Sequence, residues 1–212
     1  MNERLYIPYS KASLILDEGD ILLFRGTGFI SALIKIAGEG QYSHVAIASK
    51  HNGNWEAVEF REWYGGRTVD LENYIKESAK TKVEIDVYRP SPWFTTLKFD
   101  SNEEKVKTIR TKFEGKIVTT CMRKLTGFPY SYKRIWLILK IKLFRWKILR
   151  DLNKITNELP SEELVYPVCS TVLAYCFAKH SYSILRSKND QYMEPSDYSI
   201  SPRCNYLFTF KA

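Results

Sequence analysis

A cysteine, a histidine and a glutamate in this chain have the types and surroundings needed for nucleophilic catalysis. Cys169 follows Pro167, and since proline blocks helix extension toward the N-terminus, a helix is predicted to begin at or beside Cys169. The N–H groups of that first turn and a nearby imidazole would both favour the thiolate, which is the nucleophilic form of cysteine. His44 is the candidate for that imidazole, and Glu59 is the candidate for the polar group that fixes its orientation and tautomer.

A purely structural interpretation of the same residues stays open. Cys169, Val172, Cys176 and Phe177 fall on one face of the predicted helix, and buried free cysteines are common in protein cores. A single histidine in a strand is likewise more often structural than catalytic. The pattern of the helix alone therefore does not distinguish a nucleophile from a core residue.

The distance between His44 and Glu59 depends on a predicted β-hairpin. The segments SHVAIAS and WEAVEF flank the turn HNGN, whose Asn-Gly pair is the strongest short hairpin signal. In a tight hairpin the numbers of paired residues sum to about 105, which places Glu59 on the same sheet face as His44 and diagonal to it. A bulge of one residue would bring Glu56 to that face instead, so Glu56 is the alternative third residue.

The first half of the chain is typical of strands and the second half mostly of helices. Strands are predicted in LILDEGDILLF after its Asp-Glu-Gly turn, in the hairpin, and in RTVDL and VEIDVYRP, which together imply a mainly antiparallel sheet. Helices are predicted over residues 29–37, 103–114 and 169–180. This order predicts an α+β fold in which an antiparallel sheet packs against helices on one of its sides.

The excess positive charge is confined to one segment of the chain. Lys and Arg outnumber Asp and Glu by 32 to 24, but no acidic residue lies between Glu114 and Asp151. Within that gap, residues 133–150 carry too many bases among their apolar residues to span a membrane. They form either a core-packing helix with its bases in solvent or a surface for an anionic membrane or polymer. We expect no nucleic-acid partner, because no recognition motif accompanies the charge.

The spacing of cysteine and histidine shows no metal-binding pattern, and we expect neither a structural zinc site nor another cofactor. No CxxC pair occurs among the cysteines, and the histidines do not cluster with them. The N-terminal run MNERLYIPYSK lacks the apolar centre of a signal peptide, which predicts a cytoplasmic protein with an option of peripheral membrane contact. A length of 212 residues without a linker predicts one domain, residues 1–212, with an insertion at about 115–160.

Four runs of the sequence together resemble a known family. They are GDILLFRGTGFISALIKIAGEGQYSHVAIA, EAVEFREWYGGRTVDLENYI, VCSTVLAYCF and PSDYSISP. In order, they carry Gly-Asp before a first strand, Ser-His opening a second, a polar residue on a third, and Cys-Ser at a late helix. This pattern is similar to that of the circularly permuted papain-like hydrolases of the YiiX type, in the NlpC-like superfamily that includes lecithin retinol acyltransferase. The similarity spans roughly residues 17–90 and 165–202, and the basic segment lies outside it.

The resemblance implies a role for each candidate residue. Cys169 would be the nucleophile, His44 the general base and Glu59 the orienting residue, whereas Asp20 would fix the turn into the first strand. The residues that could line the substrate site are Tyr42, Ser43 and Glu56.

The reaction that the resemblance implies is hydrolysis of an amide bond through an acyl-enzyme. The substrate would be a peptide or a peptidoglycan fragment. One alternative is a lipid esterase or acyltransferase that uses the same three residues at a membrane surface. Another is a non-catalytic module that binds a membrane or polymer and merely buries its cysteines.

Overall fold

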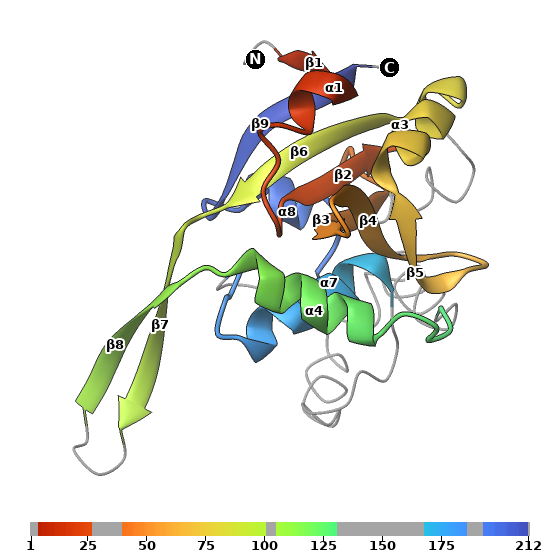
Figure 1. Ribbon diagram of the computed structural model, residues 1–212. Coiled ribbons are helices and arrows are strands. Elements are labelled where there is room, and N and C mark those ends of the chain that lie inside the picture. The colour runs from red at the N-terminus through yellow and green to blue at the C-terminus, as the bar shows by residue number, and fades with distance from the viewer. Residues whose placement is uncertain (1–3, 27–39, 101–104, 131–167, 186–192, 212) are drawn as a thin grey trace, which may run out of the picture.

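A mainly antiparallel sheet organises the molecule. The structure is a computed structural model that describes residues 4–26, 40–100, 105–130, 168–185 and 193–211. Within these residues, seven strands form one sheet in the order β1-β9-β6-β2-β3-β4-β5 (Figure 1). Every neighbouring pair is antiparallel except β1 and β9, which confirms the predicted sheet type. The strands are β1 (Tyr6–Pro8), β2 (Ile21–Arg25), β3 (His44–His51), β4 (Asn54–Arg61), β5 (Gly65–Asp70), β6 (Glu84–Pro90) and β9 (Cys204–Lys211).

Helices cover both faces of this sheet. Because strand side chains alternate between faces, the buried apolar residues form two clusters, one on each face. Helix α3 (Leu71–Lys80) contributes to one cluster, and α4 (Gly115–Lys124) and α7 (Cys169–Lys179) contribute to the other (Figure 1). The prediction of helices on one side is therefore wrong, because α3 follows β5 directly and folds back over the second face. Two further helices are short, α1 (Tyr9–Ala12) and α8 (Asp197–Ile200).

The hairpin of β3 and β4 has the predicted register. Ala46 pairs with Glu59 and Ala48 pairs with Ala57, without a bulge between the two strands. Asn52 and Gly53 at the turn have positive φ values of 49° and 85°, as the two central residues of a type I′ turn require.

The predicted helix over residues 103–114 is wrong. The structure forms β8 (Lys105–Lys112) there, which pairs with β7 (Trp93–Asp100) in a separate two-stranded sheet. This hairpin extends away from the main sheet (Figure 1). The run KVKTIRTK is rich in β-branched residues, and pairing with a preceding strand of aromatic residues and threonine outweighs the helical spacing of its apolar residues.

Two other predictions concern residues outside the described ranges. The helix over 29–37 and the basic segment 133–150 both fall there, so both stay predictions. The predicted helix over 169–180 is confirmed as α7.

Candidate active site

The hairpin brings His44 and Glu59 into contact. His44 is the first residue of β3, and Glu59 lies on β4 opposite Ala46, one paired position further along the same face. The His44 Nε2 donates to the Glu59 Oε2 at 2.5 Å. The Glu59 side chain is fully buried, and His44 is 8% exposed. The sequence-predicted pair is therefore formed by strand register alone.

Cys169 meets the other side of the same imidazole. It is the first residue of α7, is 3% exposed, and its side chain interacts with that of His44. Because Nε2 is bonded to Glu59, Nδ1 is the ring nitrogen that is left for other partners. The structure thus brings Cys169, at a helix N-terminus, beside the hydrogen-bonded pair of His44 and Glu59 on the sheet.

Two residues that the sequence analysis missed hold Glu59 in place. Arg67 on β5 lies directly opposite Glu59, and its Nε and Nη2 both contact the Oε1 of Glu59, at 2.8 and 2.7 Å. The Tyr74 hydroxyl on α3 donates to Oε2 at 2.7 Å, and the Arg61 guanidinium in turn donates to that hydroxyl. Arg67 could have been found from the pairing of β4 with β5, whereas Tyr74 required knowledge of α3.

These contacts give the pair its charges. Burial lowers the pKa of His44, but the Glu59 carboxylate and the Cys169 side chain outweigh burial and raise it to about 10. Burial raises the pKa of Glu59, but His44, Tyr74 and Arg61 together lower it to about 2. An imidazolium beside a carboxylate is therefore the stable form of the His44–Glu59 pair at neutral pH.

The start of α7 is fixed by hydrogen bonds to its second residue. The Ser170 hydroxyl donates to the Met193 carbonyl at 2.6 Å, and the Tyr198 hydroxyl donates to the Ser170 carbonyl at 2.7 Å. Tyr198 lies on α8, within the run PSDYSISP, and is fully buried. This late segment therefore positions the residue next to Cys169.

Tyr42 and Ser43 precede β3 and form hydrogen bonds to its neighbouring segments. Tyr42 is 2% exposed and its hydroxyl donates to Asp86 on β6 at 2.6 Å. The Ser43 hydroxyl accepts from the backbone N–H of Gly26 at 3.1 Å. Both residues support the start of β3 beside His44, and a substrate-lining role for either stays a prediction.

Glu56 and Asp20 lie away from the catalytic candidates. Glu56 is on the opposite sheet face from Glu59, where its carboxylate contacts the Arg123 Nη2 at 2.6 Å. The absence of a bulge in β3 and β4 explains this position. Asp20 accepts from the backbone N–H of Asp17 at 2.8 Å and forms an ion pair with Arg89, so it fixes the turn before β2 as predicted.

Comparison with known proteins establishes the fold. No family model matches the chain, and no curated protein matches it. Among solved structures, the chain is similar to the metalloprotein YiiX from Escherichia coli O157:H7, with a TM-score of 0.52 and 13% sequence identity. The similarity covers 90% of this chain and 96% of that one. The chain therefore has a YiiX-type α+β fold, as the sequence motifs predicted.

Metal binding would require several ligating side chains close together. In the described part of the chain, no three His, Cys, Asp or Glu side chains gather in a way that could hold a metal ion. The side chains around Glu59 are instead arginine and tyrosine donors. The described residues around His44 and Glu59 therefore do not fit a bound metal. Within the same residues, every helix is too short or too polar to cross a membrane.

Proposed function

We propose that this protein is a cysteine hydrolase that cleaves an amide bond in a peptide or a peptidoglycan-type peptide. The observation that carries the proposal is the position of one buried imidazole, which is hydrogen-bonded to Glu59 and lies beside Cys169. The resemblance of the motifs to papain-like hydrolases supplies the bond type.

Each group has a defined part in the proposed reaction. The Cys169 thiolate attacks the carbonyl carbon, and the backbone N–H groups at the start of α7 receive the developing oxyanion. The His44 Nδ1 proton passes to the leaving amine as the carbon–nitrogen bond breaks, which leaves an acyl-enzyme. His44 then accepts a proton from water as the water attacks the thioester carbonyl, the carbon–sulfur bond breaks, and the acid product leaves the Cys169 thiolate beside the His44 imidazolium. Glu59 keeps the imidazole oriented through Nε2 and remains ionised throughout.

The first experiment is site-resolved alkylation of the folded protein with iodoacetamide from about pH 5 to 9. Peptide mass spectrometry quantifies each cysteine. We expect Cys169 to react well at pH values where an ordinary thiol, with a pKa of about 8.5, reacts slowly. His44→Ala should remove this advantage. His51→Ala is the matched control, because His51 lies at the exposed end of the same strand. A Cys169 that reacts like an ordinary thiol in the wild type would refute the catalytic pair.

The second experiment separates amide from ester chemistry. Wild-type protein and Cys169→Ser are incubated with muropeptides and with acyl esters, including a phospholipid. The proposal predicts amide cleavage that falls by about 10³-fold or more in the variant. Ester cleavage alone, lost in the same variant, would assign the site to lipid or acyl chemistry instead.

A further inference from the structure

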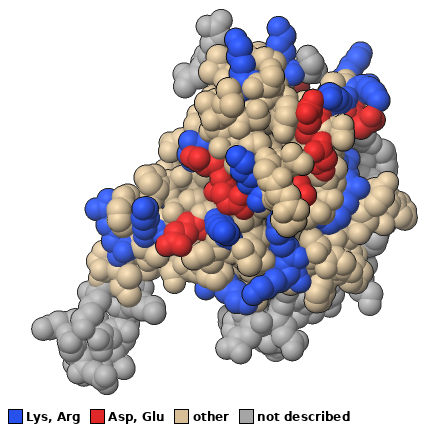
Figure 2. Space-filling view, viewed as in Figure 1, with Lys and Arg blue, Asp and Glu red and all other residues tan. Residues whose placement is uncertain are grey.

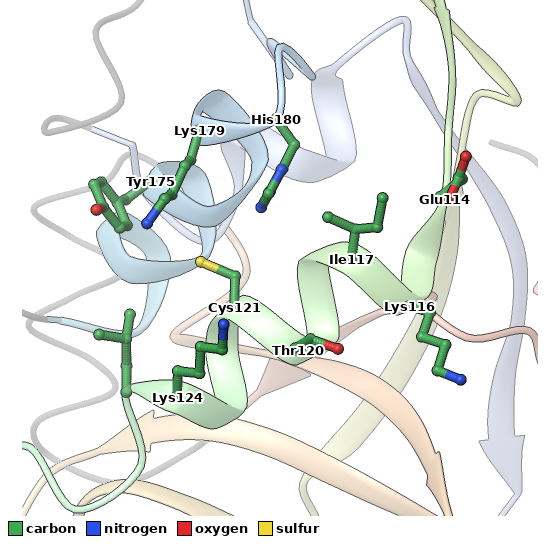
Figure 3. A pocket seen from close by; sticks show the side chains of 10 residues that line it. Glu114, Lys116, Ile117, Thr120, Cys121, Lys124, Tyr175, Lys179 and His180 are labelled. Atoms are coloured by element: carbon green, nitrogen blue, oxygen red, sulfur yellow. The ribbon is translucent and has the colours of Figure 1, made fainter.

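A pocket lies between α4 and α7, apart from the contact of Cys169 with His44. Its volume is about 370 Å³, and Figure 3 shows the side chains that line it. Lys116 and Lys124 come from α4, and Lys179 comes from the end of α7. On the face seen in Figure 2, Lys and Arg side chains gather over α4. The remaining lining residues are Glu114, Ile117, Thr120, Cys121, Leu125, Tyr175 and His180.

The charge of this pocket is positive around its thiol. In Figure 3 the amino groups of Lys124 and Lys179 lie on either side of the Cys121 sulfur, and Glu114 lies at the far end. Burial, Lys179 and Lys124 lower the pKa of His180, so its imidazole is neutral and the lysines supply the charge. Such a lining favours small ligands that carry carboxylates.

Cys121 has a second thiol directly behind it. Helices α4 and α7 pack together in one core cluster, where the side chain of Cys176 on α7 interacts with that of Cys121 on α4, and both cysteines are free. Cys121 is 9% exposed and borders the pocket, whereas Cys176 is fully buried and does not. A reagent in the pocket therefore reaches Cys121 first.

The two thiols are electrostatically unequal. The interaction with Cys176 lowers the pKa of Cys121 against the opposing effect of burial, and Lys179 and Lys124 lower it further. The same interaction and burial raise the pKa of Cys176. Cys121 is thus suited to attack a bound disulfide first, and Cys176 is suited to attack the mixed disulfide that results.

We propose that Cys121 and Cys176 are a redox-active thiol pair that reacts through this pocket with small acidic disulfides of the glutathione type. The Cys121 thiolate attacks one sulfur of the disulfide, whose S–S bond breaks, and the first small thiolate leaves and takes up a proton. The Cys176 sulfur then attacks the Cys121 sulfur of the mixed disulfide. The second small thiol leaves with the Cys176 proton, so one small disulfide is reduced and one protein disulfide is formed.

The test uses the full chain as Cys169→Ser, which removes the other candidate nucleophile. The reduced protein is incubated with glutathione disulfide, and linked peptides are mapped by mass spectrometry without reduction. We expect a Cys121–Cys176 disulfide, with Cys204 unreacted as an internal control because burial raises the pKa of Cys204 to about 12. With Cys176→Ser added, Cys121 should be trapped as the mixed disulfide. With Cys121→Ser added, Cys176 should stay unmodified.

A second arm tests the selectivity of the pocket. The double substitution Lys124→Gln and Lys179→Gln should slow the reaction with glutathione disulfide about tenfold and leave that with neutral 2-hydroxyethyl disulfide nearly unchanged. Lys76→Gln on α3, away from the pocket, is the matched control.

Four results would overturn the proposal. They are a folded protein that forms no Cys121–Cys176 disulfide, modification of Cys176 without Cys121, equal slowing with both disulfides, and equal slowing by Lys76→Gln. The disulfide mapping needs no substitution at Cys121 or Cys176, so it decides the question even if the variants at those two positions fail to fold. None of these results depends on whether Cys169 is catalytic.

Discussion

Cys169 and Cys121 are both buried cysteines, but the groups that face them differ in kind. Cys169 adjoins an imidazole that a fully buried carboxylate holds from the sheet. Cys121 adjoins a second thiol and two ammonium groups carried by helices. The first arrangement orients a single proton, which acyl transfer needs, and the second supplies positive charge and another sulfur, which disulfide exchange needs. The chemistry open to each thiol therefore depends on the side chains that neighbouring helices and strands place beside it.

The largest effect should come from removing the buried carboxylate, which the Cys169 site has and which the Cys121 pocket, with its exposed Glu114, does not. Glu59→Gln leaves the charges of His44 and Arg67 without their buried partner, and we expect the free energy of unfolding to fall by ~3–5 kcal/mol. Urea denaturation measures this loss. A change below ~1 kcal/mol would mean that solvent already screens the pair.

The pH dependence of stability should report the same contacts. Since the pKa of Glu59 is lowered from 4.5 to about 2, its contribution is present above pH 4.5 and is lost as the pH falls toward 2. Since the pKa of His44 is raised from 6.5 to about 10, its contribution is complete below pH 6.5 and is lost as the pH rises toward 10. Urea midpoints measured across this range should therefore peak between pH 4.5 and 6.5. In Glu59→Gln both flanks should become flatter, and unchanged flanks would contradict the assignment.

Removing one donor from Glu59 should have an intermediate effect. Tyr74→Phe deletes the hydroxyl that donates to Glu59, and a hydrogen bond to a charged group contributes ~1.5–3 kcal/mol. Chemical denaturation gives the loss. Tyr6→Phe is the matched control, because the Tyr6 hydroxyl donates to Glu84 at an exposed site and should matter much less. Equal losses in the two variants would show that burial adds nothing at Tyr74.

The smallest effect is expected on the other sheet face. Glu56→Gln removes an ion pair with Arg123 that is only partly buried, and we expect a loss of ~0.2–1 kcal/mol. It should also leave the alkylation rate of Cys169 unchanged. Slower alkylation of Cys169 in this variant would make Glu56, and not only Glu59, a candidate for the residue that orients His44.

Local signals were enough to predict that Glu59 lies beside His44 and that a helix begins at Cys169. The Asn-Gly turn fixes the register of β3 and β4, and that register alone brings Glu59 to His44. Pro167 before Cys169 marks where α7 begins. Arg67 and Tyr74 were missed because their positions depend on β5 and α3, which join the site through tertiary contacts.

The error at β8 has a related cause. Its apolar residues fit helical spacing, but the strand forms because β7 precedes it and pairs with it along its whole length. When the pattern of a short segment fits both a helix and a strand, pairing with a neighbouring strand decides which one forms. The sequence of the segment alone does not contain this information.

Helix α7 carries both Cys169 and Cys176, seven residues apart, and this has a thermodynamic consequence. Suppose that a disulfide between Cys176 and α4 changes the affinity of Cys169 for a reversible ligand. Then ligand binding at Cys169 must change the stability of that disulfide by the same free energy. A reversible covalent inhibitor held at Cys169 would then shift the midpoint potential of the Cys121–Cys176 pair, by about 30 mV for each tenfold change in inhibitor affinity. Ligand binding at Cys169 would then be measurable as a shift in the redox potential of the Cys121–Cys176 pair.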